Sequence, residues 1–196
     1  SSAASDVYKR QVLVPPTDYN GNITLNVSAL SQDGSASTLE SAAENLTFNL
    51  APVSEEPELT VQDSSGSEDT PILLSVTPTK ADVNGVLSIE ISGVPTGAQL
   101  GTYSGSSFTA FTANGDGTYT LTDSDIDLSA SNTLAVQLAA NDSSNFDITL
   151  SVTEQETGAD PSAPVTETLA VTVSAVSDEA TLTFKDSTGT EIAANV

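Results

Sequence analysis

The chain has 196 residues, a formal net charge of −23 from 27 acidic and 4 basic side chains, and no Cys, His, Met or Trp. This composition excludes disulfides and thiolate catalysis, and it removes the commonest general base and transition-metal ligand. The excess of carboxylates disfavours nucleic acid and anionic membrane surfaces as partners and favours Ca²⁺, which prefers oxygen ligands. Solubility, or adaptation to salt, is the alternative explanation of the charge.

The first eleven residues, SSAASDVYKRQ, resemble the in-frame translation of a sequencing adaptor. The resemblance implies that residues 1–11 are not native to the protein, and that the chain is translated from an environmental sequencing read truncated at both ends. We therefore leave these residues out of the prediction of the fold and expect them to be disordered. A natural disordered N-terminus is the alternative.

An acidic phrase occurs twice in the chain, at an offset of 123 residues. Residues 53–68 read VSEEPELTVQDSSGSE and residues 176–191 read VSDEATLTFKDSTGTE, with nine of sixteen positions identical. The same offset aligns residues 12–52 with 135–175, and a period of this length suits a whole domain. We predict three pieces: the C-terminal part of a preceding repeat (12–52), one complete repeat (53–175) and the start of the next (176–196).

Short strands are predicted throughout the complete repeat, because apolar and polar residues alternate with period two between turn signals. No helical pattern competes with this alternation. The aromatic residues Phe108, Phe111, Tyr119 and Phe146 are expected to supply bulk to the core. In chain order the predicted strands are 59–63, 71–76, 86–92, 117–122, 133–139, 145–153 and 167–176.

Seven short strands in one repeat predict an all-β fold of tandem antiparallel β-sandwiches, immunoglobulin-like or cadherin-like in type. The sequence NGDG at 114–117 predicts a hairpin turn. A little further on, Asp123, Asp125 and Asp127 would share one face of an extended segment. They would either bind an ion or protect an exposed sheet edge from pairing, and we favour edge protection.

Carboxylates gather where one repeat joins the next. Glu55 and Glu56 lie in the join, and Glu68 and Asp69 follow the first strand of the new repeat. Because the join has no Gly/Ser tract, it is not a free coil. A bound Ca²⁺ would remove the repulsion between crowded carboxylates and fix the angle between repeats, whereas solvated linker charge is the alternative. The second copy of the phrase repeats the arrangement at Asp178, Glu179 and Glu191.

Three motifs in order resemble the tandem immunoglobulin-like or cadherin-like repeats of large bacterial surface adhesins, including adhesins that carry RTX segments. The resemblance covers residues 12–196. The motifs are VSEEPELTVQDSSGSEDT (53–70), LSIEISGVPTGAQL (87–100) and NGDGTYTLT (114–122).

Such repeats usually carry an Asp-rich turn that ends in Gly-Ser-Glu before a strand. Here the segment KADVNGVLSI (80–89) lacks the Ser-Glu, and it offers Asp82 and Asn84 as the candidate calcium ligands that the resemblance implies. The glycine–aspartate nonapeptides of an RTX β-roll are absent from the sequence.

The resemblance implies a secreted or surface-anchored protein in which repeats extend an adhesive tip and Ca²⁺ stiffens the joints. We therefore expect a non-catalytic, calcium-binding spacer of a bacterial cell-surface adhesin, acting outside the cell in adhesion and biofilm formation. Its partners would be neighbouring repeats of the same chain, with a host or surface ligand bound through other domains. No apolar run approaches the ~20 residues of a membrane span, so direct membrane insertion is not expected.

Two other functions are kept as alternatives. One is a module that binds a sugar or a protein receptor itself, and the other is an accessory domain of a secreted enzyme. The regular repeat and the aromatic content of 5% favour the spacer over the ligand-binding module. Paired carboxylates can serve a glycosidase, but no His-, Cys- or Ser-centred motif is present, and we expect no enzymatic activity.

Overall fold

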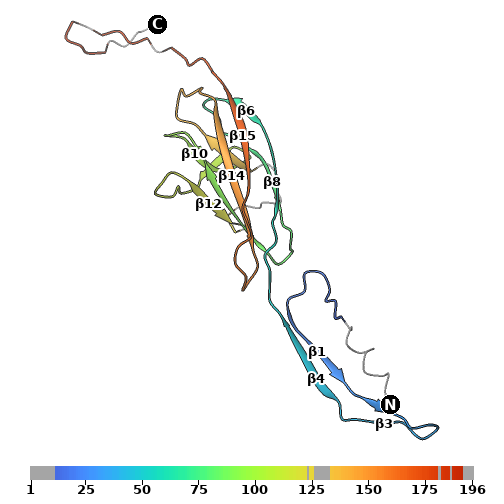
Figure 1. Cartoon of the computed structure of the whole chain (residues 1–196). Helices are drawn as coiled ribbons and strands as arrows, with labels where there is room; N and C mark the ends of the chain where they lie inside the picture. Colours follow the sequence, from blue (N-terminus) through green and yellow to red (C-terminus); the bar gives the residue numbers. More distant parts are fainter. Residues whose placement is uncertain (1–11, 123, 126–132, 181, 186, 192–196) are drawn as a thin grey trace.

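β-Strands make up the regular structure of this chain, as a computed structural model describes it (Figure 1). The structure describes residues 12–122, 124–125, 133–180, 182–185 and 187–191. None of these residues is helical, so the described chain has no helix that could cross a membrane. The predicted all-β class is confirmed.

The strands differ in length from two to ten residues. Their bounds are β1 (Gly21–Val27), β2 (Leu30–Ser31), β3 (Leu39–Glu40), β4 (Glu44–Leu50), β5 (Glu58–Gln62), β6 (Ser64–Ser67), β7 (Ile72–Leu73), β8 (Ser75–Thr79), β9 (Val86–Ser92), β10 (Gln99–Ser104), β11 (Ser107–Ala110), β12 (Tyr119–Thr122), β13 (Leu134–Gln137), β14 (Phe146–Gln155) and β15 (Val165–Ser174).

Two sheets form a β-sandwich. One has the strand order β12-β9-β14-β15-β6 and the other β11-β10-β13-β7, while β5 and β8 form a separate pair. Neighbouring strands are antiparallel except β15 and β6, which run parallel. The expected sandwich architecture is therefore present, and its immunoglobulin-like or cadherin-like type stays a prediction.

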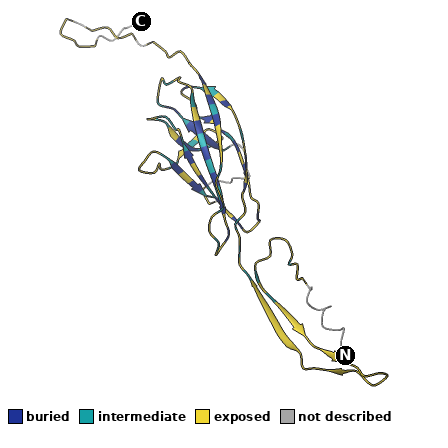
Figure 2. Cartoon of the chain, viewed as in Figure 1, coloured by how far each residue is buried: buried dark blue, intermediate teal, exposed yellow. Residues whose placement is uncertain are grey.

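The core lies between the sheets because alternate residues of strands such as β9, β14 and β15 face inward (Figure 2). On β14 and β9 the register sets Leu150 opposite Ile91 and Val152 opposite Ile89, and all four are fully buried. Val136 of β13 belongs to the same core and comes from the opposite sheet. Period-two burial thus selects the register, since a slip of one residue would turn the apolar set outward.

Each predicted strand has a counterpart, although the segment 71–76 forms parts of two strands, β7 and β8. Strands β6, β10 and β11 were not predicted, because their sequences SSGS, QLGTYS and SFTA show no clean alternation. Gly101 has a specific role in β10. A Cβ atom there would lie 2.2 Å from the Thr109 carbonyl oxygen and 2.7 Å from Cζ of Phe108, so only glycine lets β11 approach this closely.

The aromatic residues differ in how deeply they enter the core. Tyr119 is buried, and its hydroxyl accepts a 3.4 Å hydrogen bond from the Leu100 N–H. Phe111 and Phe146 are partly buried and pack against the core, and Phe108 is half-buried over Gly101. The prediction of core bulk is confirmed for Tyr119 and holds only in part for the phenylalanines.

The NGDG segment forms a turn, but the hairpin predicted for it is wrong. Gly117 has φ = 84°, and the Asn114 N–H donates to the Thr118 carbonyl at 2.7 Å. The strands on either side, β11 and β12, belong to different sheets. A tight turn signal is local, whereas the sheet that each flanking strand joins depends on distant partners.

A separate two-stranded hairpin, β1–β4, precedes the sandwich (Figure 1). Its register pairs Ile23 with Phe48 and Leu25 with Leu46. Adding 123 to each number gives Phe146 with Val171 and Ile148 with Leu169, which are pairs of β14 and β15. The offset of 123 residues seen in the sequence therefore also relates two hairpins that have the same pairing register. The division of the chain into repeats stays a prediction.

Burial differs sharply between matched positions of the two hairpins. Leu169 is 0% exposed, while its counterpart Leu46 is 50% exposed. We expect Leu169→Ala to lower the free energy of unfolding by about 2–5 kcal/mol, and Leu46→Ala to lower it by about 1 kcal/mol or less. Urea unfolding followed by circular dichroism measures both values. Equal losses would contradict the assignment of the core.

Candidate functional site

The segment between β4 and β5 joins the hairpin to the sandwich, and three contacts lie at this joint, two of them made by the segment itself. The Glu156 N–H donates to Oγ of Ser54 at 2.9 Å, and Nδ2 of Asn20 donates to Oε1 of Glu156 at 2.7 Å. Gly158 lies against the ring of Pro52, since a Cβ at this glycine would be 3.5 Å from Cγ of the proline. The turn after β14 therefore contacts both the joint and the residues that lead into β1.

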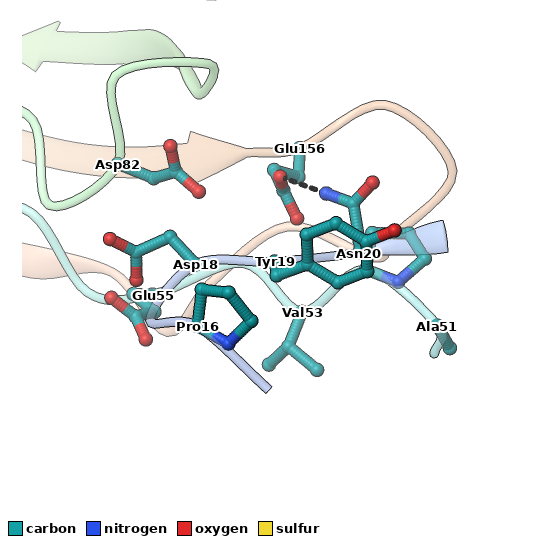
Figure 3. A pocket seen from close by; sticks show the side chains of 10 residues that line it. Pro16, Asp18, Tyr19, Asn20, Ala51, Val53, Glu55, Asp82 and Glu156 are labelled. Carbon is teal, nitrogen blue, oxygen red and sulfur yellow. Dashed lines mark hydrogen bonds between the residues drawn. The ribbon is translucent and has the colours of Figure 1, made fainter. Parts of the chain in front are cut away.

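A cavity of about 180 Å³ lies at this joint and is open to solvent (Figure 3). Four carboxylates border it, and they come from four separate stretches of the chain. In Figure 3 three of them gather on one side and Glu156 lies on the other. The lining residues are Pro16, Asp18, Tyr19, Asn20, Ala51, Pro52, Val53, Glu55, Asp82 and Glu156.

The four carboxylates differ in burial. Asp82, in the turn between β8 and β9, and Glu156, just after β14, are each only 5% exposed. Asp18, before β1, and Glu55, in the joint, are exposed. The sandwich therefore contributes two buried carboxylates, and the joint and the residues that lead into β1 contribute one exposed carboxylate each.

Glu154 holds the turn that carries Asp82. It is 1% exposed, and its Oε2 and Oε1 accept the N–H groups of Ala81 at 2.7 Å and Asp82 at 2.9 Å. Within the turn, the Asn84 N–H donates to Oδ1 of Asp82 at 2.9 Å. Hydrogen bonds from main-chain N–H groups compensate the burial of an anion, so Glu154 sets the position of Asp82.

These residues fit a hard divalent cation by the chemistry of their donors. Carboxylate oxygens, together with the amide oxygen of Asn20, are ligands that Ca²⁺ prefers, and its coordination tolerates flexible geometry. As the described side chains are arranged, no three acidic groups lie close enough to hold a metal ion. Binding therefore requires rotation of the exposed Asp18 and Glu55 side chains toward Asp82 and Glu156.

The remaining predicted ligands near this joint take no part in the cavity lining. Glu56 is exposed, and Asn84 is exposed with its N–H bonded to Asp82. The cavity thus brings together two residues that the sequence singled out, Glu55 and Asp82.

Glu68 lies at the opposite end of the sandwich. Its N–H donates to the Ser174 carbonyl at 3.0 Å, and its Oε1 accepts the Val176 N–H at 2.7 Å. Since β15 spans ten residues, this end is about 30 Å from the joint cavity. The other predicted ligands of this end are exposed, namely Asp69, Asp178, Glu179 and Glu191.

Sequence reasoning missed Asp18 and Glu156. Glu156 had a usable signal, because it continues the period-two row of β14 that begins with the buried Ile148 and Leu150 and passes through Glu154. Asp18 had a weaker one. It has φ = 57° and corresponds at the 123-residue offset to Asn141, which has φ = 61°.

The acidic segment after β12 is only partly described, because Asp123 and Asp127 lie outside the described residues. Oδ2 of Asp125 accepts the N–H and hydroxyl of Thr122 at 2.7 and 2.8 Å. These bonds lower the pKa of Asp125, the hydroxyl contributing most. Asp125 therefore acts as a local cap at the end of β12, an edge strand.

Comparison with protein-family models gives no match for this chain, and comparison with curated proteins gives none either. The candidate site therefore depends on its own geometry and donor chemistry.

The carboxylate of Asp116 accepts hydrogen bonds that lower its pKa. The N–H of Thr118 and then its hydroxyl lower the pKa of Asp116 below the ordinary value of 3.8. Thr118→Val removes only the hydroxyl, so it should raise the pKa part of the way back. The stabilisation from this turn is present above the unfolded pKa and is lost as pH falls through the folded value. NMR titration of the Asp116 carboxyl carbon measures this, with Thr120→Val as the control.

Gly85 tests the role of Glu154. A Cβ at Gly85 would lie 1.9 Å from Oε1 of Glu154, whereas a Cβ at Gly115 would meet nothing within 4 Å. We expect Gly85→Ala to destabilise the fold by about 1–3 kcal/mol, because the buried carboxylate must move off its two N–H donors. Gly115→Ala should change stability little. Thermal unfolding compares the two variants, and equal melting temperatures would contradict the role of Glu154.

Proposed function

We propose that this chain is a non-catalytic spacer of a bacterial cell-surface adhesin, and that Ca²⁺ stiffens its joints. The observation that carries the proposal is the set of four carboxylates that border one cavity at the joint between hairpin and sandwich. Two of them belong to the sandwich, one to the joint and one to the residues that lead into β1, so one ion bound among them would connect the sandwich to the hairpin.

Each carboxylate has a distinct part in the proposed site. Asp82 accepts a hydrogen bond within its own turn and Glu156 accepts one from Asn20 across the joint, so both provide oxygen atoms whose positions are fixed. Glu55 provides oxygen atoms from the joint itself, and Asp18 provides them from the residues that lead into β1. When bound, Ca²⁺ supplies the positive charge that cancels the repulsion among these groups.

The spacer role is supported by the path of the chain. The hairpin lies at one end of the sandwich, and the segment after β15 leaves from the other end (Figure 1). Modules joined in this way extend in one direction. The internal similarity at 123 residues supports such an array, and the resemblance to tandem adhesin repeats supports a place outside the cell.

The partners of this module are then its own neighbours in the chain, and other domains of the protein bind the host or surface ligand. Spacers of this kind need no reactive group and no deep cleft. The module gains its effect from length and from stiffness, both of which depend on the joint.

Calcium binding gives the test. With dissociation constants of roughly 10⁻⁴–10⁻³ M, as in extracellular modules, 10 mM Ca²⁺ should stabilise the protein by about 1–3 kcal/mol relative to chelator. The double variant Asp82→Asn/Glu156→Gln should lose this gain. Glu90→Gln, an exposed site on β9, removes one charge away from the joint and should keep it. Calorimetry with Ca²⁺ and with Mg²⁺ measures the effect.

Small-angle scattering provides the second readout. The maximum dimension should rise, and the flexibility between hairpin and sandwich should fall, when Ca²⁺ replaces chelator. If the dimensions are equal in both buffers and calorimetry detects no binding, the calcium-stiffened joint is ruled out.

A further inference from the structure

The β1–β4 hairpin is largely exposed (Figure 2), and its paired apolar residues Ile23–Phe48 and Leu25–Leu46 share one face that no other described strand covers. Leu25 is 36% exposed and Phe48 is 37% exposed, and both edges of this two-stranded sheet lack a neighbour among the described strands. Exposed apolar side chains on a strand pair with open edges mark a surface that binds another chain segment.

The β14–β15 hairpin gives the covered form of the same surface. Its pairs Phe146–Val171 and Ile148–Leu169 occupy the positions of Ile23–Phe48 and Leu25–Leu46 after the shift of 123 residues. Here Ile148 and Leu169 are fully buried. The two hairpins share register and apolar pattern and differ in what lies against them.

The cover of β14–β15 has two parts. Strand β9 pairs along the free edge of β14, with Ile91 opposite Leu150 and Ile89 opposite Val152. The second sheet then lies over the apolar face through Leu134 and Val136 of β13. Strand β9 and the strands β7, β10 and β11 of the second sheet fall within residues 53–134, whereas residues 135–137 of β13 correspond at the offset to residues 12–14, which this chain already has before β1.

We propose that the β1–β4 hairpin is a docking surface for a further polypeptide segment patterned like residues 53–134 of this chain. The segment adds a β9-like strand along residues 26–32, which begin at the end of β1 and correspond to residues 149–155 of β14, the stretch that β9 pairs with. It places a second sheet over Leu25, Leu46 and Phe48. This mode of recognition combines main-chain pairing at an edge with burial of alternate side chains.

A second copy of the hairpin, as an alternative occupant, would cover the apolar face but not the strand edges. Two hairpins packed face to face would bury the apolar side chains but would leave every edge of β1 and β4 unpaired. A second copy of the whole chain already uses its residues 53–134 to cover its own β14–β15. An additional segment patterned like residues 53–134 would both pair with a strand edge and bury the apolar face. It would do so without calcium.

A fusion protein tests the proposal. Residue 135 corresponds to Val12 at the 123-residue offset, so a copy of residues 53–134 is joined directly to Val12 and the chain continues to residue 196. Hydrogen exchange is then measured by NMR in chelator. The amides of β1 and β4 should exchange more slowly than in the unfused chain, by about 100-fold or more. The Ile148 amide, buried in both proteins, is the internal reference.

The matched control carries Ile89→Asp and Ile91→Asp in the added copy only, and it should give no protection of β1 and β4. Unchanged exchange in the fusion, with Ile148 still protected, overturns the proposal, as does equal protection by the Asp-bearing control. Protection in the unfused chain that grows with protein concentration also overturns it and identifies a second copy as the occupant. Because chelator is present throughout, failure here leaves the calcium proposal untouched.

Discussion

The inward-facing row of β14 continues past its apolar residues into Glu154 and Glu156, and a buried carboxylate must find hydrogen-bond donors. In this strongly acidic chain the donors are mainly main-chain N–H groups and an asparagine amide. Glu154 binds the turn that carries Asp82, and Glu156 binds Asn20 across the joint. Glu68 does the same for Val176 at the far end. Glutamates therefore determine how the chain enters and leaves the sandwich.

The same need for hydrogen-bond donors explains why the buried glutamates and the proposed calcium site lie at the same end of the sandwich. The turn held by Glu154 presents Asp82 to the cavity, and the turn that begins at Glu156 contacts the joint through Ser54. Acidic residues that a core would ordinarily reject are tolerated because each has donors. Their unused oxygen atoms then face the side from which Asp18 and Glu55 approach.

Alternation with period two was sufficient to predict the strands that bury one face, such as β9, β14 and β15, because their burial repeats the sequence pattern residue by residue. It was insufficient for β6 and β10. Those strands form where a distant partner provides the pairing, β15 for one and β13 for the other. The NGDG turn was predictable as a turn, while the sheets of its flanking strands were not.

The candidate site was predictable in part. Glu55 was recognised from its place in the joint, and Asp82 from the resemblance. Glu156 continues the buried row of β14, but the strand predicted from the sequence ended at residue 153, three residues before it. The distance between Glu55 and Glu68 in space could not be predicted from their sequence separation alone. The thirteen residues from one to the other include the extended strands β5 and β6, which bring Glu68 to the other end of the sandwich.

The parallel pairing of β6 with β15 has a mechanical consequence. The chain enters the sandwich at the pole near β5 and leaves it at the opposite pole, after β15. Tension along this axis pulls β6 and β15 past each other, in opposite directions along their length. The hydrogen bonds between them are then loaded together in shear, so they must break as a group and cannot open one after another like a zipper.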